Sequence, residues 1–385
     1  MHILQVTPYF PPTWAFGGIP RIVDGLSRAL VEKGHSVTVL TTDAFDESQR
    51  CGLATDRDHH GVRVLMVRNR SNRVAYRHQL FLPVGVQEAL DTLGSTVDVM
   101  HLHGHRHLLN NDAVRWAASN AVPYVLTANG TLLRHERKVG VKWVWDRFVS
   151  GHVPRGAAKL IAVSSADVAR HRSAGIDSGR VERIPNGLDL GEFEALPETG
   201  AFRARLGLHE GPVVTYLGRV SPRKGVEHLV RAFAGEELGD AQLVIAGNDM
   251  GAMGTAKAEP HGSNVHFAGL VEGDDRLRLL SDTDVLVYPS ADEVFGLVPF
   301  EGLLCGAPVV VADDCGCGEL IAEAGAGLLV RYGDIEGIRS RIRTLLEDRE
   351  AAQAMVGRGR RYVREQLGFS TIAERHLAVY REVAR

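Results

Sequence analysis

Short runs of aliphatic and β-branched residues alternate with segments of helix length from the start of the chain. Residues 3–6 form such a run, residues 22–33 have the length of a helix, and residues 36–40 form the next run. This order is typical of a βαβ unit. Further apolar runs follow at residues 97–102, 123–127 and 160–163. The pattern therefore predicts one doubly wound sheet in the first half of the chain.

The alternation starts afresh after a polar, turn-rich stretch that follows residue 189 and reaches about Leu206. Interruptions of this kind mark the loops between domains. Four strand-length runs then follow the new start at residues 213–217, and they lie at residues 242–246, 265–268, 285–288 and 309–311. We therefore predict a first domain over residues 1–188 and a second α/β domain from residue 189 onward. In parallel sheets of this kind, ligands bind beyond the carboxyl ends of the strands.

Length and composition fit a globular protein of two domains. The 385 residues are more than one ordinary core needs, and 44% hydrophobic and 24% charged residues exclude a disordered chain. No apolar run approaches the roughly 20 residues that span a bilayer, and no secretory signal pattern precedes the first strand. The four cysteines form neither a CxxC pair nor a disulfide framework. We therefore expect a cytoplasmic protein in which Cys315 and Cys317 are small loop residues.

The two halves differ in charge although the whole chain carries −3. Residues 1–190 hold 23 Lys and Arg against 17 Asp and Glu, whereas residues 191–385 hold 21 against 30. Positive charge in the first half can steer an anionic acceptor or an anionic membrane surface toward it. An unevenly charged, solvated surface explains the same counts equally well.

The stretch at residues 288–302 reads Tyr-Pro-Ser-Ala-Asp-Glu-Val-Phe-Gly-Leu-Val-Pro-Phe-Glu-Gly and combines a strand end, a loop and a helix start. Pro299 suits the first turn of a helix, so we expect the helix to begin within residues 296–298. The free N–H groups of that turn form a site for a diphosphate. This reasoning assigns four residues to the binding of a sugar donor that carries a diphosphate: Phe295, Gly296, Leu297 and Val298.

Two glutamates in this stretch are candidate sugar ligands. Glu293 lies in the approach loop and Glu301 inside the expected helix. Eight residues do not stack two side chains on one helical face, so we expect different roles: Glu293 for hydroxyls of the donor sugar and Glu301 for the ribose. The structural alternative is that Glu293 caps the helix and Glu301 is a surface carboxylate.

Two cations favour the donor interpretation. Residues 218–225, Gly-Arg-Val-Ser-Pro-Arg-Lys-Gly, directly follow the first strand of the second domain. Arg219 and Lys224 can neutralise a departing nucleoside diphosphate there without a metal. A basic surface turn is the alternative for this loop when it is considered alone.

The loop after the first predicted strand contains adjacent glycines, Gly17 and Gly18. Such a pair lets backbone N–H groups approach a phosphate or a sugar closely. The chain has no GxGxxG, so the dinucleotide fingerprint of dehydrogenases is missing.

Four histidines alternate at the end of a predicted strand, at positions 101, 103, 105 and 107. They would share one face if the strand continued, which makes a metal site conceivable. We expect the strand to end near His103, however, and no carboxylate or cysteine accompanies the run. The preferred interpretation is a single histidine, His103, that reaches a sugar hydroxyl.

Taken together, the order and spacing of these residues resemble the retaining GT-B glycosyltransferases of family 4, also described as glycosyl transferases group 1. The resemblance covers nearly the whole chain. The glycine pair of that family matches Gly17 and Gly18, which lie against the donor phosphate. Its Asp-x-x-His-x-His stretch matches residues 98–103, whose second histidine, His103, faces the transferred sugar.

The remaining matches of this resemblance lie in the second half. The Arg and Lys that bind the diphosphate in the family match Arg219 and Lys224. Its two glutamates, separated by seven residues, match Glu293 and Glu301, which contact the sugar and the ribose. Residues 316–319, Gly-Cys-Gly-Glu, resemble a Gly-rich turn that follows the next strand.

The resemblance implies a GT-B fold of two Rossmann-like doubly wound domains that face a cleft. Residues 1–188 would form the acceptor-side domain and residues 189–364 the nucleotide-sugar-binding domain, while a C-terminal helix at about residues 365–385 crosses back to the first. It implies retaining transfer of a sugar from a nucleotide diphosphate sugar, UDP- or GDP-linked, to an acceptor hydroxyl. Cell-envelope polysaccharide or glycolipid biosynthesis is the expected setting.

The family resemblance also implies a mechanism without a metal or other cofactor. The leaving phosphate deprotonates the acceptor hydroxyl on the same face of the sugar, and the implied catalytic residues are His103, Arg219, Lys224 and Glu293. Glu293 positions the sugar and is not a nucleophile. Asn129 stands where many relatives carry His, and with His105 it is assigned to the acceptor side.

Residues 134–155 combine basic and aromatic side chains. Trp145, Phe148, Val149 and His152 recur there at helical spacing. A peripheral helix on anionic lipid at the inner face of the membrane has this pattern and fits a lipid-linked acceptor. An amphipathic helix packed on its own sheet is the alternative. The expected partners are thus a nucleotide sugar and a sugar or lipid-linked acceptor, and no nucleic acid.

Other functions on the same fold remain open. An epimerase-type enzyme or a phosphorylase is one class, but a phosphorylase needs a pyridoxal-binding Lys, and Lys257 is the only Lys of the second domain besides Lys224. A nucleotide-sugar-binding protein without catalysis is another. The charged residues at positions 219, 224, 293 and 301 favour the transferase over both.

Overall fold

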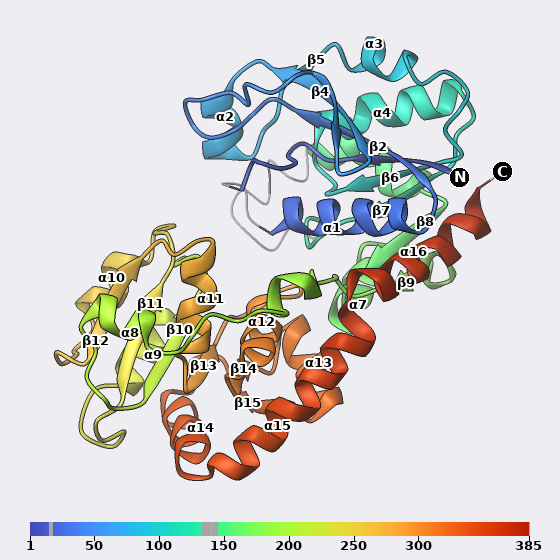
Figure 1. The fold of residues 1–385 in the computed structure, drawn as a ribbon. Coiled ribbons are helices and arrows are strands. Elements are labelled where there is room, and N and C mark those ends of the chain that lie inside the picture. The colour runs from blue at the N-terminus through green and yellow to red at the C-terminus, as the bar shows by residue number, and fades with distance from the viewer. Residues whose placement is uncertain (15–17, 133–139, 141–144, 385) are drawn as a thin grey trace. The chain divides into compact units, whose positions relative to one another are not determined.

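The computed structural model describes residues 1–14, 18–132, 140 and 145–384. The chain divides into two compact units, shown in Figure 1. The first unit contains Met1–Leu188 and Leu367–Arg385, and the second unit contains Asp189–Gln366. Each unit is an α/β structure around a mainly parallel sheet, which confirms the predicted fold class.

Among the residues that the structure describes, the sheet of the first unit has nine strands in the order β3-β4-β2-β1-β6-β7-β8-β9, with β5 paired to β4. The strands are β1 (His2–Val6), β2 (Ser36–Thr42), β3 (Asp56–His59), β4 (Val62–Asn69), β5 (Pro83–Val84), β6 (Val99–His103), β7 (Tyr124–Thr127), β8 (Lys159–Ala162) and β9 (Val181–Arg183). Strands β3 and β5 run antiparallel to β4, and the apolar pattern did not predict them. The reason is visible in β3, whose four residues are all polar.

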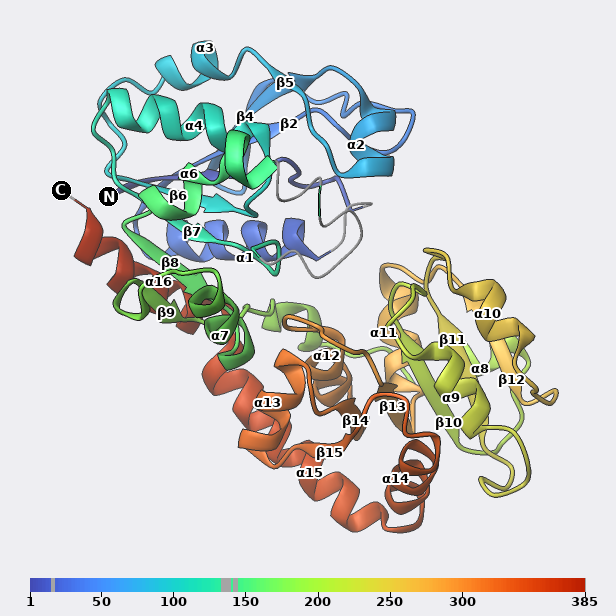
Figure 2. The ribbon, with the colours of Figure 1, turned by 180° about the vertical axis from the view of Figure 1, so that it is seen from behind.

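The helices and short helical turns of the first unit are α1 (Ile19–Glu32), α2 (Asn72–His78), α3 (Val86–Asp91), α4 (Leu108–Ser119), η1 (Asp146–Ser150), α6 (His152–Gly156), α7 (Ser165–Ser173), η2 (Ser178–Arg180) and α16 (Phe369–Val383). Helices α1 and α16 bury Leu30 and Tyr380 on one face of the sheet. Helices α3 and α4 lie on the other face, as Figures 1 and 2 show, and bury Leu90 and Trp116 there. The sheet is therefore doubly wound.

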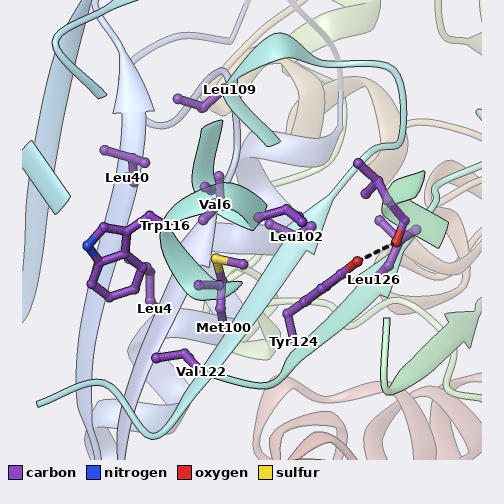
Figure 3. Packing of buried hydrophobic residues seen from close by; sticks show 14 of the residues in the cluster. Leu4, Val6, Leu40, Met100, Leu102, Leu109, Trp116, Val122, Tyr124 and Leu126 are labelled. Carbon is purple, nitrogen blue, oxygen red and sulfur yellow. Dashed lines mark hydrogen bonds between the residues drawn. The ribbon is translucent and has the colours of Figure 1, made fainter. Parts of the chain in front are cut away.

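The core on the α4 face is drawn in Figure 3, where Trp116 lies among aliphatic side chains of the central strands. Leu4, Met100 and Leu126 come from three neighbouring strands of this core, and all are fully buried. Tyr124 brings the one hydroxyl group in view, which donates to the Val153 carbonyl at 2.8 Å. Burying a phenol is tolerable here because that hydrogen bond satisfies it.

The C-terminal helix α16 packs closely on α1. A Cβ at Gly25 would lie 1.9 Å from the Phe369 ring, so this approach of the two helices requires glycine. The chain is also fastened just before α16, where the Leu188 N–H donates to the Leu367 carbonyl at 2.8 Å. These contacts explain why the end of the chain belongs to the first unit.

A cluster of buried polar side chains lies beneath α16. Tyr380 Oη is 2.7 Å from His101 Nδ1, and His101 Nε2 is 2.7 Å from Thr127 Oγ1. The His101 ring also lies 4.1 Å from that of His103 and 5.5 Å from that of His376, measured between ring centroids. Three imidazoles are thus packed together away from water.

The second unit has six parallel strands in the order β12-β11-β10-β13-β14-β15. These are β10 (Val213–Leu217), β11 (Gln242–Ala246), β12 (Val265–Gly269), β13 (Val285–Tyr288), β14 (Val309–Ala312) and β15 (Gly327–Val330). The apolar runs predicted five of them to within one residue. Their helices and helical turns are η3 (Leu190–Phe193), α8 (Ala201–Leu206), α9 (Val226–Ala232), α10 (Met253–Ala258), α11 (Asp274–Ser281), α12 (Val298–Cys305), α13 (Gly316–Ala324), α14 (Ile335–Glu347), α15 (Arg349–Tyr362) and η4 (Val363–Leu367).

Acid is expected to destabilise the first unit. Burial lowers the pKa of His103 to about 3 and that of His376 to about 4, and burial with the neighbouring imidazoles lowers the pKa of His101 well below its ordinary value. The unfolded chain binds these protons near pH 6.5 and the folded chain does not. Stability is therefore full above about pH 6.5 and falls as the pH drops toward 4, by about 1.4 kcal/mol per unit for each histidine.

Urea unfolding between pH 7.5 and 5 measures this loss. His376→Gln is expected to give a shallower slope of unfolding free energy against pH than the wild type. His78→Gln is the matched control because His78 is exposed on α2. Equal slopes for all three proteins would contradict the conclusion that buried His376 makes stability depend on pH.

Candidate active site

The strand order of the second unit reverses beside β10. Strands β11 and β12 follow on one side of β10, whereas β13 lies on its other side. Loops that leave the carboxyl ends of β10 and β13 therefore diverge, and such switch points are the usual ligand sites of open α/β sheets. The loop after β10 carries Arg219 and Lys224, and the loop after β13 carries Glu293.

Lys224 and Glu293 meet at this switch point. Lys224 Nζ forms an ion pair with Glu293 Oε2 and lies 3.2 Å from Tyr288 Oη. Tyr288 Oη donates to the same carboxylate oxygen at 3.0 Å. The structure thus brings together two residues that the sequence predicted to share a site and adds a tyrosine to them.

The charges of this cluster set its protonation state. Burial alone would raise the pKa of Glu293, but the Lys224 ammonium and the hydrogen bonds from Lys224 and Tyr288 outweigh it, so that pKa lies below its ordinary value. Burial and the Glu293 charge raise the pKa of Tyr288 well above its ordinary value. At neutral pH the cluster therefore contains a carboxylate and a protonated phenol.

The neighbouring arginines differ in their surroundings. Arg219 is exposed, and its positive charge contributes to the lowered pKa of Glu293. Arg223 forms an ion pair with Asp292, which belongs to the same loop as Glu293. Arg219 is thus the arginine of this loop whose charge acts on Glu293.

Helix α12 begins at Val298, within the predicted interval, with proline in its first turn. The Leu297 carbonyl accepts from Phe300 and Glu301, and no side chain caps this end of the helix among the described residues. Pro299 has no N–H, and the Phe300 and Glu301 amides already donate to Leu297, so the Val298 amide and the positive end of the helix dipole are what this turn offers to an anion. Gly296 has φ of 82°, a left-handed conformation that glycine adopts without strain.

The predicted donor residue Phe295 is a core residue. Its side chain is 3% exposed, and its ring lies 5.5 Å from that of Phe300 between centroids. Only its backbone can contact a ligand, because the ring fills the interior beside α12. The assignment of Phe295 to donor binding is thus limited to its main chain.

Glu301 is neither a surface carboxylate nor free. It is 7% exposed, and its Oε2 lies 2.8 Å from Arg276 Nη1 of α11. Arg276 also pairs with Glu192 and lies over the Phe193 ring at 5.7 Å. Arg276, which the sequence analysis did not single out, thus fixes the carboxylate that was predicted to contact the ribose.

Residues 316–319 form the first turn of α13 and not a loop, which corrects the expectation for Cys317, whereas Cys315 lies in the loop just before the helix, as expected. Cys315 Sγ caps this helix by accepting from the Gly318 N–H at 3.2 Å, and Cys317 is fully buried. The Gly316 N–H donates to the Glu293 carbonyl at 2.9 Å, and a Cβ at Gly316 would lie 2.0 Å from the Val294 carbonyl oxygen. This glycine lets α13 hold the Glu293 loop.

The first unit has its own switch point, since β2 and β6 lie on opposite sides of β1. Gly18, after β1, is the exposed N-cap residue of α1 and leaves this helix end without a side-chain cap. Gly17 lies outside the described residues. Strand β6 ends at His103, as expected, so His105 and His107 follow it in the loop.

His103 is 2% exposed and does not reach open solvent. Its Nε2 lies 2.7 Å from Gln5 Oε1, and its Nδ1 is buried without a partner among the described residues. It lines a small cavity with Thr127 and Asn186. An imidazole that donates through Nε2 keeps Nδ1 as an acceptor, which suits a hydroxyl donor.

The two predicted acceptor-side residues have local partners. His105 is buried, and its Nε2 lies 3.2 Å from the Ser150 carbonyl oxygen, while its Nδ1 is buried without a partner among the described residues. Asn129 has φ of 49° in the turn after β7, a conformation that Asn adopts more readily than most residues. Neither the surroundings of His105 nor the conformation of Asn129 identifies an acceptor.

Two classes of feature are absent from the part of the chain that the structure describes. Within it, no group of three or more His, Cys, Asp or Glu side chains is arranged to hold a metal ion. None of the described helices has both the length and the apolar character needed to cross a membrane.

Comparison with known proteins matches both halves of the chain. The family profile "Glycosyl transferases group 1" matches residues 199–362, and the profile "Glycosyltransferase Family 4" matches residues 16–192. An uncharacterised glycosyltransferase of Methanocaldococcus jannaschii is 28% identical, with 99% of this chain and 98% of that protein covered. The alpha-maltose-1-phosphate synthase of Mycolicibacterium smegmatis is 31% identical over 68% of this chain and 74% of its own length.

A solved structure has the same fold. The Anabaena protein HepE in complex with UDP-glucose matches with a TM-score of 0.74 at 19% identity, over 99% of this chain and 100% of that one.

The pair of Arg276 and Glu301 is expected to be important for stability. Both side chains are 9% exposed, and removing one partner of a buried pair leaves an unpaired charge. Arg276→Met should therefore lower the unfolding free energy by about 3–5 kcal/mol in urea titrations. Arg278→Met is the matched control on the same helix, because the Arg278–Asp275 pair is 43% and 34% exposed and should contribute at most about 1 kcal/mol. Similar losses for the two variants would contradict this assignment.

Proposed function

The chain belongs to the group 1, family 4 glycosyltransferases, and from this membership we propose that it transfers a sugar with retention of configuration from a UDP- or GDP-linked donor. The acceptor is a hydroxyl group of a sugar or lipid-linked molecule in cell-envelope polysaccharide or glycolipid synthesis. The observation that carries the proposal is the Lys224–Glu293 pair at the switch point of the second sheet. It offers a cation for a diphosphate and an anion for sugar hydroxyls at one place.

The charged groups suit the departure of a nucleoside diphosphate. As the bond between the anomeric carbon and the phosphate oxygen breaks, negative charge accumulates on the diphosphate. Lys224, Arg219 and the positive end of the α12 dipole would neutralise it, so the proposal needs no metal ion. Glu301, held by Arg276, would accept hydrogen bonds from the ribose.

The transfer step is proposed to occur on one face of the sugar. The acceptor oxygen bonds to the anomeric carbon while its proton passes to the leaving phosphate oxygen, which gives a glycoside and a nucleoside diphosphate. Glu293 would orient the sugar through its hydroxyls and form no covalent bond.

A thermal-shift panel with UDP, GDP, ADP and their common sugars, with and without EDTA, tests donor binding. A ligand that binds the native state raises the melting temperature by mass action. The likeness to HepE, which holds UDP-glucose, makes UDP the first nucleotide to test. A shift that survives EDTA supports metal-independent binding, and no shift with any nucleotide would contradict the proposal.

Lys224→Ala is expected to lower kcat/KM for the donor about 100- to 1000-fold, because it removes charge stabilisation at the leaving group. Release of nucleoside diphosphate measures the rate. Lys257→Ala is the matched control, since Lys257 is exposed on α10 in the same unit and should keep wild-type turnover. Wild-type turnover in Lys224→Ala would contradict the assignment of Lys224 to the diphosphate. If the wild-type protein binds the donor but shows no turnover, the alternative of a nucleotide-sugar-binding protein is favoured.

Peripheral membrane contact through residues 134–155 is a second part of the proposal. Residues 134–139 and 141–144 of this segment lie outside the described residues. From residue 145 onward, the segment forms the π-helical turn Asp146–Ser150 and the short α6 in place of the regular α-helix expected from the spacing. The turn is tied inward by the ion pair of Asp146 with Arg106 at 2.7 Å. Phe148 remains 73% exposed beside the Arg147 guanidinium, as a residue that inserts into an anionic surface would be.

Phe148→Ser is expected to reduce sedimentation of the protein with phosphatidylglycerol vesicles several-fold, because it removes the exposed apolar group. Leu270→Ser is the control, since Leu270 is 61% exposed in the second unit. Equal sedimentation of the two variants would leave internal packing as the explanation of this segment.

A further inference from the structure

Tyr288 connects the two charged residues on which the proposed function rests. Its Oη lies 3.0 Å from Glu293 Oε2 and 3.2 Å from Lys224 Nζ, and Lys224 pairs with the same carboxylate oxygen. The Lys224 ammonium also lies over the Tyr288 ring, 5.3 Å from its centre. One carboxylate oxygen thus receives a phenol hydrogen bond and an ammonium group together.

The Tyr288 ring is held rigidly by its neighbours. It is 5% exposed and stacks on the Tyr216 ring at 6.2 Å with an interplanar angle of 7°. Tyr216 lies on β10, and its Oη donates to the Arg219 carbonyl at 2.8 Å. The two strands that flank the switch point therefore fix the position of the Tyr288 hydroxyl before any ligand binds.

Donor binding as proposed places competing demands on the pair. In the proposed donor complex, Lys224 binds the diphosphate and Glu293 binds the sugar. In this structure, however, the two residues form an ion pair with each other. When Lys224 turns to the phosphate, Glu293 loses its nearest positive charge while it stays in a largely enclosed place. A carboxylate in that position requires another hydrogen-bond donor to remain ionised.

We propose that Tyr288 is a positioning residue that keeps Glu293 an ionised hydrogen-bond acceptor while Lys224 is engaged by the diphosphate. This inference rests on the proposed function and deepens it. The Tyr288 hydroxyl remains on Glu293 Oε2 in both states, so the carboxylate keeps its place for the sugar hydroxyls.

The charges and titratable groups around Glu293 agree with this role. Those that act on it or feel its charge come from four elements: Lys224 and Arg219 in the loop after β10, Tyr216 on β10, Tyr288 on β13 and Cys317 on α13. Of these, Tyr288 is the neutral group that donates a hydrogen bond to the carboxylate. Burial and the Glu293 charge raise its pKa well above the ordinary value, so it keeps its proton throughout the neutral range.

Tyr288→Phe tests the inference because it keeps the ring and removes the hydroxyl. The assay measures nucleoside diphosphate release from the donor that the thermal-shift panel identifies, between pH 4.5 and 8. Loss of the hydrogen bond raises the pKa of Glu293, so the acidic limb of the rate profile moves to higher pH. We expect a shift of about one pH unit in kcat, which reports the donor complex. The limb of kcat/KM should move less, because Lys224 still pairs with Glu293 in the free enzyme.

Tyr216→Phe is the matched control, since it removes from the same ring stack a hydroxyl that donates to the Arg219 carbonyl instead of to the Glu293 carboxylate. Its acidic limbs are expected to coincide with those of the wild type. Replacing Tyr288 by 3-fluorotyrosine provides a second variant with an intact hydroxyl that donates more strongly, and it should shift the kcat limb to lower pH.

The inference is overturned if Tyr288→Phe lowers activity without moving the kcat limb, or if 3-fluorotyrosine leaves that limb in place. Tyr288 would then be a packing residue only. Failure of the proposed function has a different signature, because the wild-type protein would bind no nucleotide sugar in the thermal-shift panel.

Discussion

Parallel strands that reverse their order place the loops of this protein where chemistry can occur. Beside β10 in the second sheet and beside β1 in the first, consecutive loops leave on opposite sides of the sheet. In open α/β sheets, such a divergence of the connections leaves a crevice at the carboxyl ends of the strands, which is the usual place for a ligand. Lys224 and Glu293 lie at the first of these places, and Gly18 and His103 at the second. Strand order therefore determines where the candidate residues of each unit lie, and side-chain contacts then fix their positions.

Two ion pairs in the second unit behave differently because their exposure differs. Arg276 and Glu301 are each 9% exposed, and neither can leave the other without stranding a buried charge. Lys224 and Glu293 are 14% and 22% exposed, at the open edge of the sheet. The first pair can therefore act as a fixed support for ligand binding, whereas the second can exchange its partners when a ligand arrives. In the proposed role, the Tyr288 hydroxyl continues to donate a hydrogen bond to the Glu293 carboxylate during that exchange.

The sequence predicted most strands of the second unit well, because β10, β11, β13 and β14 are runs of fully buried, mainly β-branched and aliphatic residues. It did not predict β15, in which only Val330 is buried. It did not predict β3, whose residues are all polar, or the π-helical turn near Phe148, which depends on packing against the rest of the unit. Charged residues in loops identified Arg219, Lys224 and Glu293. Tyr288 and Arg276 carried no such signal, since a tyrosine at a strand end and an arginine in an amphipathic helix are ordinary residues until their partners are seen. The burial of His103 and His105 likewise depends on contacts with residues distant in sequence.

The most direct test of the account is a crystal structure of the protein with a non-hydrolysable nucleotide sugar, grown with EDTA. The account predicts the diphosphate against Lys224, Arg219 and the start of α12, with the sugar hydroxyls on Glu293 and the Tyr288 hydroxyl still on that carboxylate. A diphosphate bound elsewhere, or one bound while Lys224 remains paired with Glu293, would contradict it.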